Sequence, residues 1–267
     1  MVNGFILNWQ LFYGFVLSLL IVFISYRFKS LNFSGSIATL ILGTLVFGVG
    51  GWLWAVPILT FFITSSALSK IGKSYKQKLQ DTFEKSGTRD HWQVIANGGI
   101  GGILVLLAVF DPDKSEFYFW AYTISFAAAT ADTWATELGV VLKGKPVLIT
   151  TLKPVKPGVS GGVSVYGSVA SFLGSFLIMW LTSIFFHLST EKILVFTIFG
   201  FLGSLVDSFL GATIQGQYRC TVCGKYTEKK MHCDKETKLI KGYRWLNNDL
   251  VNLIAILASV LIYFLFS

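Results

Sequence analysis

Charged residues are scarce in this sequence. They make up 13% of its 267 residues, whereas soluble domains carry about 25%. Hydrophobic residues make up 53%, and the mean hydropathy of +0.63 is typical of a membrane protein. This composition excludes a soluble globular domain and predicts an all-α, polytopic integral membrane helix bundle.

Apolar stretches long enough to cross a bilayer as a helix, about 20 residues, recur along the chain. We expect about eight transmembrane helices, with seven to nine compatible with the pattern, at residues 5–26, 33–50, 52–69, 92–110, 116–141, 163–187, 191–214 and 249–266. The second and third share a glycine-rich corner, "FGVGGW", so residues 33–69 are interpreted either as two helices or as one re-entrant unit.

A cleavable signal peptide, long-period repeats, low-complexity segments and a soluble domain are all absent from the sequence. The start, "MVNGFILNWQLF", has no basic residue and no Ala-x-Ala site, so the first helix is expected to be a permanent anchor. We interpret residues 1–267 as a single transmembrane domain.

Basic residues are unevenly divided between the connections. Those after the first, third, fifth and seventh helices hold 20 of the 22 lysines and arginines. By the positive-inside rule these connections, which include 70–91, 142–162 and 215–248, face the cytoplasm, and both termini lie outside. Topology and attraction to anionic lipid headgroups thus explain the net charge of +8, and nucleic acid is not an expected partner.

Two acidic residues, Asp132 and Glu137, interrupt the apolar fifth segment. At 100° per residue they share one helix face with Thr133 and Thr136. A carboxylate inside a membrane is costly, so it is by default a candidate for a functional site. Glu137 alone has an alternative interpretation, as a residue that marks the water interface.

Three other helices bring polar side chains to the same depth. Asp207 in the seventh helix lies between Gly203 and Gly211 at intervals of four residues, and Asn97 lies near the start of the fourth. The last helix opens with "WLNNDLVN", in which Asp249 is interpreted either as a helix N-cap or as part of the polar group with Asn248 and Asn252. This convergence predicts one polar site just inside the cytoplasmic surface.

The loop "KGKPVLITTLKPVKPGVSGGVSVYGS" leads into the sixth helix. The backbone at Ser160, Gly161 and Gly162, with Lys153 and Lys156, is predicted to bind phosphate, although ordinary inside-positive lysines before a helix are the alternative. No Walker A motif is present. Because carboxylates beside phosphate-binding groups suit Mg²⁺, we predict Asp132, Glu137 and Asp207 as the ligands of one or two Mg²⁺ ions in a site for phosphoryl transfer.

All three cysteines lie in one short segment, "CTVCGKYTEKKMHC". Thiols on the cytoplasmic side stay reduced, so the CxxC pair favours metal binding over a disulfide. A structural Zn²⁺ site is one interpretation, and free thiols are the other. Its ligands would be Cys220, Cys223, His232 and Cys233.

Five stretches together resemble the transmembrane protein 19 family, also called domain of unknown function 92. They are "GTRDHWQVIANGG", "ADTWATELGV", "LITTLKPVKPGVSGGVSVYGS", "GATIQGQY" and "WLNNDLVN". The family includes the plant phytyl-phosphate kinase, so the resemblance implies phosphorylation of a prenyl or polyprenyl monophosphate by a nucleoside triphosphate such as CTP. It also implies that Arg89 assists in binding nucleotide phosphates. The lipid phosphate would be oriented by Asn97, Asn248, Asp249 and Asn252, or these residues would support the groups that contact it.

The competing hypothesis is transport, by an ion-coupled carrier or a lipid-phosphate flippase, since intramembrane acids and glycine-rich helices also suit such proteins. A non-catalytic scaffold would explain the topology but not the polar cluster. The charge bias predicts an integral multi-pass protein of the plasma membrane, and an organelle membrane is the alternative that it also fits.

Overall fold

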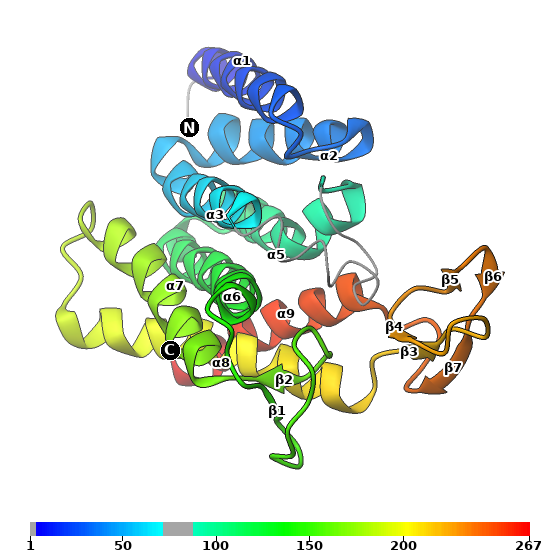
Figure 1. The fold of residues 1–267 in the computed structure, drawn as a ribbon. Helices are drawn as coiled ribbons and strands as arrows, with labels where there is room; N and C mark the ends of the chain where they lie inside the picture. The colour runs from blue at the N-terminus through cyan, green and yellow to red at the C-terminus, as the bar shows by residue number, and fades with distance from the viewer. Residues whose placement is uncertain (1–3, 72–87) are drawn as a thin grey trace.

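The computed structural model describes residues 4–71 and 88–267. Within these ranges the chain forms eight α-helices, arranged as a bundle (Figure 1). Each begins and ends within five residues of a predicted apolar stretch, which confirms the predicted fold class. The helices are α1 Gly4–Arg27, α2 Phe33–Leu45, α3 Trp52–Lys70, α5 His91–Phe110, α6 Ser115–Val141, α7 Val165–Ser183, α8 Thr190–Thr213 and α9 Asn248–Phe266.

Helix α6 is the centre of the bundle. Seven of the described helices are long and apolar enough to cross a membrane, and α6 is the exception, although its 27 residues make it the longest. Every residue from 119 to 131 is buried, because α6 packs against α3, α5, α7, α8 and α9. A helix covered by protein has no need of a lipid-facing apolar surface, so it can carry alanine, serine and threonine.

Residues 33–69 form two helices and not one re-entrant unit. A short π-helical turn, Val46–Gly50, extends α2, and α3 begins at Trp52. Gly51 between them has a φ of 87°, a left-handed conformation that glycine adopts without a steric penalty. The two segments, 18 and 19 residues long, each have the length and hydropathy of a membrane span.

The ends of the described chain lie on one side of the bundle. In Figure 1 the start of α1 and the C-terminus are on the left, with the corner between α2 and α3, while the connections after α1 and α8 are on the right. This arrangement agrees with the alternation of basic and non-basic connections. The compartment that each side faces stays a prediction from charge.

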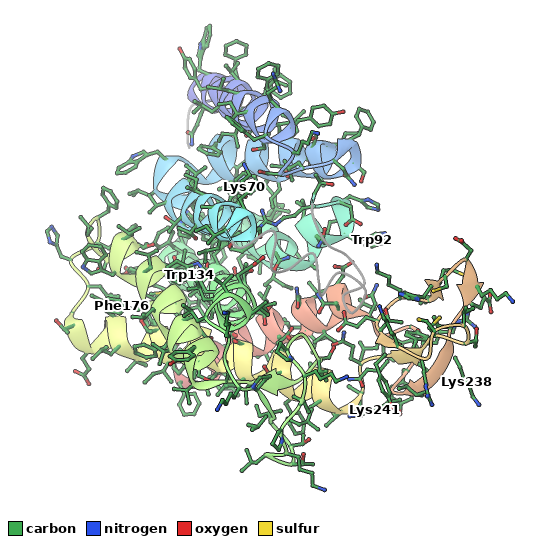
Figure 2. The ribbon with its side chains drawn as sticks, in the orientation of Figure 1. Lys70, Trp92, Trp134, Phe176, Lys238 and Lys241 are labelled. Atoms are coloured by element: carbon green, nitrogen blue, oxygen red, sulfur yellow. The ribbon has the colours of Figure 1, made fainter. Side chains whose placement is uncertain are left out.

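Short strands, which the sequence did not lead us to expect, occupy two of the basic connections. After α6, β1 Val147–Leu148 pairs with β2 Gly162–Val163. Between α8 and α9, residues 214–247 form a segment that we call the β arm. It contains a sheet of β3 Gln217–Arg219, β4 Tyr226–Thr227 and β7 Lys238–Lys241, and a hairpin of β5 Met231–His232 and β6 Lys235–Glu236. Lys238, labelled on β7 in Figure 2, lies outside the helix bundle, whereas the side chain of Lys241 donates to the backbone oxygen of Ala212 in α8.

Aromatic side chains fill the core around the first half of α6. The rings of Trp54, Phe119 and Tyr122 lie within 6.4 Å of one another, centroid to centroid, and Phe126 continues the stack. The Tyr122 hydroxyl donates to the backbone oxygen of Trp54 at 2.6 Å, which satisfies a polar group that would otherwise be buried without a partner.

Small residues in the second half of α6 allow α8 to come close. A Cβ atom built on Gly203 would lie 2.9 Å from the Cβ of Ala128, so only glycine fits there. The two helices run in the same direction through the bundle, since α7 returns the chain between them. Asp132 and Asp207 each follow this contact by one helical turn, so the contact turns the two acids toward each other.

Candidate active site

A cavity of about 370 Å³ lies where α5, α6, α8 and α9 meet the loop before α7 and the β arm. Thirteen of the predicted site residues line it, although they are spread from position 89 to position 252. They are Arg89, Asn97, Asp132, Thr133, Thr136, Glu137, Ser160, Gly161, Gly162, Asp207, Asn248, Asp249 and Asn252.

Three carboxyl groups gather at the centre of this cavity. The carboxyl groups of Asp132 and Asp207 are close enough to share a hydrogen bond when one of them is protonated, and Glu228 of the β arm is close enough to Asp207 for their charges to interact. The Oδ2 atom of Asp207 is buried and has no hydrogen-bond partner among the described residues. Crowded carboxylates repel one another at low dielectric, so this arrangement suits a cation that would neutralise them.

Glu137 belongs to the same cavity but lies toward α3. The hydroxyl of Ser69, at the end of α3, donates to Glu137 Oε1 at 2.7 Å. Helix α6 therefore presents Asp132 toward α8 and Glu137 toward α3. The face predicted from the helical repeat, with Thr133 and Thr136, lines the cavity between them.

Arg89 is the cation at the edge of the cavity. Its Nη1 donates to Ser66 Oγ at 2.8 Å, and its guanidinium lies 5.9 and 5.6 Å from the ring centres of Phe61 and Phe62. Burial lowers the pKa of the Arg89 guanidinium to about 10, so it is still charged at neutral pH. Within the described ranges no carboxylate lies within 4 Å of it, so its charge is available to an anion.

The glycine loop before α7 is held against the end of α8. Gly161, with a φ of 78°, packs on the backbone of Ala212, where a side chain would collide. The hydroxyl of Ser160 donates to Glu228 Oε1. The N–H of Gly162 donates to Val159 O at 3.0 Å, so it is not free for phosphate as predicted. Helix α7 begins at Val165, after a Ser164 cap that itself lines the cavity.

The structure does not bring Lys153 and Lys156 to the cavity, so their binding of the same anion stays a prediction. Both side chains are exposed, and neither lines the cavity. The reason is the turn that follows β1, in which Leu148 N–H donates to Lys153 O at 2.9 Å and Leu152 takes a φ of 54°. This turn carries both lysines away from the bundle.

The start of α9 settles the alternatives for Asp249. Asn247 is the N-cap, since its side chain accepts from Leu250 N–H at 3.1 Å. Asp249 is therefore not the cap, and it is 93% buried in the cavity wall (exposed fraction 7%). One turn later, the buried Oδ1 of Asn252 has no hydrogen-bond partner among the described residues. Across the cavity, Asn97 Nδ2 donates to Gln93 O at 2.8 Å.

Comparison with known proteins decides the family. The model of a family described as "Integral membrane protein DUF92" matches residues 16–260. The chain belongs to this family. It is 36% identical to Protein PGR of Arabidopsis thaliana over 94% of each chain, and 31% identical to the uncharacterized membrane protein MJ0933 of Methanocaldococcus jannaschii over 77% of this chain and 84% of that one. With Protein VTE6, chloroplastic, of A. thaliana it shares 25% identity over 85% of this chain and 62% of that one. No solved structure matches.

Glu228, Gln215 and Ser69 are among the polar cavity residues of this DUF92 protein that sequence reasoning missed. Glu228 lies in the run "TEKKMHC", whose charges suggest nothing more than a basic cytoplasmic connection. Gln215 donates to Glu228 Oε1 at 3.2 Å, and Ser69 donates to Glu137. One feature of the sequence could have pointed to Glu228: it lies midway between the two pairs of candidate zinc ligands, so a folded metal site would fix its position.

A second, smaller cavity of about 60 Å³ in the DUF92 bundle adjoins the first. It lies between α1, α2, α3 and α5, and most of its lining is apolar, with Leu42, Ile58 and Phe62 among the lining residues. Arg89, Gln93 and Asn97 line both cavities. A polar and an apolar compartment therefore meet at these three side chains.

Proposed function

We propose that this DUF92 protein is a membrane-embedded kinase that transfers a phosphoryl group from a nucleoside triphosphate, with CTP the first candidate, to a prenyl or polyprenyl monophosphate. The observation that carries the proposal is the cavity itself. Carboxyl groups from two helices and the β arm line the same cavity as Arg89, a half-buried arginine that has no carboxylate partner among the described residues.

In the proposed reaction, an oxygen of the lipid monophosphate attacks the γ-phosphorus of the nucleotide. A new phosphorus–oxygen bond forms, the bond from the γ-phosphorus to the bridging oxygen breaks, and the nucleoside diphosphate leaves with that electron pair. A phosphate monoester is already nucleophilic at neutral pH, so the site needs positioning and charge neutralisation more than a general base.

The residues present fit Mg²⁺. Asp132 and Asp207 would hold an ion through carboxylate oxygens, the ligands that Mg²⁺ prefers, and the unpartnered Oδ2 of Asp207 is an oxygen in need of such a partner. Glu137, which is turned toward Ser69 on the α3 side of the cavity, would serve a second Mg²⁺ ion. Bound Mg²⁺ would neutralise charge on the nucleotide phosphates. Arg89 would bind a phosphate of the lipid or the nucleotide, and Asn248, Asp249 and Asn252 would orient the lipid phosphate.

The apolar cavity supports a lipid as the acceptor. A substrate with a phosphate at Arg89 would find apolar side chains of α2 and α3 on the other side of Gln93 and Asn97. That arrangement suits an amphiphile with a charged head and a hydrocarbon chain. The family includes the plant phytyl-phosphate kinase, whose substrate has this form. We place the cavity on the cytoplasmic face of the plasma membrane, because the surrounding connections are basic.

Transport is less well supported. A carrier needs access to its site from both sides of the membrane. Here the aromatic cluster of Trp54, Phe119, Tyr122 and Phe126 fills the bundle beyond the cavity. The acids therefore open toward the side of the basic connections.

The test is direct. Purified full-length protein is incubated with Mg²⁺, CTP or ATP labelled at the γ-phosphate, and a panel of prenyl monophosphates of increasing chain length. We expect labelled prenyl diphosphate from the wild type, none without Mg²⁺, and none from Asp132→Asn. The exposed acid at the opposite end of α5 supplies a control variant, Asp113→Asn, which should keep full activity. Full activity in Asp132→Asn would refute the metal assignment.

A further inference from the structure

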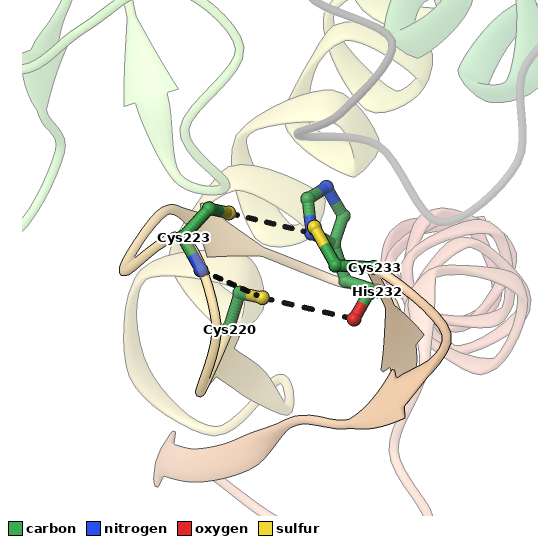
Figure 3. Close-up of side chains that lie close together, drawn as sticks. All are labelled: Cys220, Cys223, His232 and Cys233. Carbon is green, nitrogen blue, oxygen red and sulfur yellow. Dashed lines mark hydrogen bonds between the residues drawn. The ribbon is translucent and has the colours of Figure 1, made fainter.

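Four side chains of the β arm point toward one another (Figure 3). The Sγ atoms of Cys220, Cys223 and Cys233 and a ring nitrogen of His232 all lie within 4.8 Å of one another. His232 Nδ1 is 3.6 Å from Cys223 Sγ and 3.2 Å from Cys233 Sγ. Ligands of one tetrahedral zinc ion, with zinc–sulfur bonds of about 2.3 Å, are themselves about 3.5–3.8 Å apart.

The first half of this cluster is a tight turn with amide groups directed at sulfur. The backbone N–H groups of Val222 and Cys223 donate to Cys220 Sγ at 3.3 and 3.4 Å (Figure 3 shows the second). Gly224, with a φ of 71°, closes the turn by donating to Cys220 O at 3.1 Å. Amide donors stabilise a sulfur that carries negative charge, as a metal-bound thiolate does.

The second half is a hairpin whose turn is strained. Cys233 and Asp234 connect β5 and β6, with φ values of 52° and 57°. A two-residue turn with both φ values positive favours Asn-Gly, and neither residue here is glycine. Such backbone strain persists where the surrounding structure compensates for it. One of the two strained residues, Cys233, is itself a candidate metal ligand. The turn is what lets the adjacent His232 and Cys233 face the same point.

The segment that joins the two halves carries Glu228 into the large cavity. Glu228 lies five residues after Cys223 and four before His232, next to the end of β4. There it accepts hydrogen bonds from Ser160 and Gln215 and interacts with the charge of Asp207. The two ends of the segment are thus fixed by the cysteine–histidine cluster, and its middle forms part of the cavity wall.

We propose that Cys220, Cys223, His232 and Cys233 bind one zinc ion, and that this ion holds the β arm in the conformation that keeps Glu228 in the cavity. Four protein ligands leave no open coordination position, so the zinc is structural. Glu228 is a positioning residue for the carboxyl group of Asp207 and for the Ser160 loop. Its effect on catalysis rests on the proposed function, whereas the zinc site does not.

Metal analysis tests the site without any assay of activity. Full-length protein, purified in detergent without chelator, should contain about one zinc per chain, and Cys223→Ser and His232→Ala should each lose most of it. Val222→Ala is the matched control, because Val222 contributes only its backbone N–H, and it should retain zinc. Replacing zinc by Co²⁺ should give the absorption of cysteine-ligated cobalt. A wild type that binds no zinc under reducing conditions, or a Cys223→Ser protein that keeps its zinc, would overturn the site.

Hydrogen exchange tests the positioning. Peptides that cover residues 226–231 should exchange their amide hydrogens faster in Cys223→Ser than in the wild type or Val222→Ala, while peptides of α6 remain protected and show that the bundle is folded. Unchanged exchange after zinc loss would refute the link to Glu228. The measurement uses no substrate, so failure of the kinase proposal and failure of this one are distinguishable.

Discussion

At the scale of single residues, the site combines costly features that have no structural benefit of their own. The carboxyl groups of Asp132 and Asp207 lie close together inside a membrane protein, Glu228 adds a third carboxyl group, and one oxygen of Asp207 has no partner among the described residues. A core selected for stability alone would hold apolar side chains here. We infer that these carboxyl groups are kept for function, at a cost in the free energy of unfolding.

This trade-off predicts opposite effects of Asp207→Asn on stability and on activity. Removing one of three crowded carboxylates should raise the Tm of the Mg²⁺-free protein by about 2–4 °C, as ~1 kcal/mol does in a chain of this size. Phosphoryl transfer should fall roughly 100-fold or more. Thermal unfolding in detergent and the kinase assay measure the two effects. A lower Tm together with unchanged activity would mean that Asp207 is a structural residue.

The sequence was sufficient to predict some of these residues and not others, for a physical reason. Asp132, Asp207 and Asn97 lie on helices, where depth and rotation follow from position in the chain, so their convergence could be expected. Lys153, Lys156 and Glu228 lie in turns and short strands, where one left-handed residue redirects the chain. Leu152 turns the lysines outward, and pairing within the β arm directs Glu228 inward.

At the scale of elements, the site depends on how closely α8 approaches α6. Gly203 faces Ala128 of α6, and it also faces Ser259 and the backbone oxygen of Ala255 in α9. Three helices therefore meet at a position that has no room for a methyl group. The contact lies one turn from the carboxyl pair, so their separation depends on it.

Gly203→Ala should consequently weaken both the fold and the site. The added methyl group would force the helices apart at a cost of about 1–3 kcal/mol, and it would separate Asp132 from Asp207. Gly99→Ala in α5 is the matched control, since its Cβ would meet only Ile95 at an ordinary 3.4 Å and alanine favours helix by up to ~1 kcal/mol. Unfolding midpoints and activities of the two variants give the comparison, and equal effects would refute this account.

Hydropathy predicted the helices well, because a bilayer selects length and apolar character directly. The long segment that became α6 was also predicted as a helix. Its hydropathy is nevertheless too low for it to count as a membrane span by composition, because α6 is surrounded by protein. The strands of the β arm escaped prediction since each has only two to four residues, too few to show an alternating pattern.

At the scale of the whole molecule, the cavity lies on the side of the bundle that carries the basic connections. The cavity is lined by the loop before α7 and by the β arm, both of which belong to basic connections. If those connections face the cytoplasm, the site meets nucleotides there, and the C-terminus lies on the opposite face. The orientation of the chain therefore decides whether a cytosolic nucleotide can reach Asp132 at all.

Labelling of introduced cysteines checks this orientation in intact cells. Asp113→Cys, in the connection between α5 and α6, should react with a membrane-impermeant maleimide added outside. Lys153→Cys, exposed in the connection between α6 and α7, should react only after the membrane is opened. Peptide mapping separates both from the native cysteines, which stay in place to preserve the β arm. The two positions flank α6, so labelling of both from outside would mean that α6 does not cross the membrane. Labelling of Lys153→Cys alone from outside would place the cavity on the side away from cytosolic nucleotide.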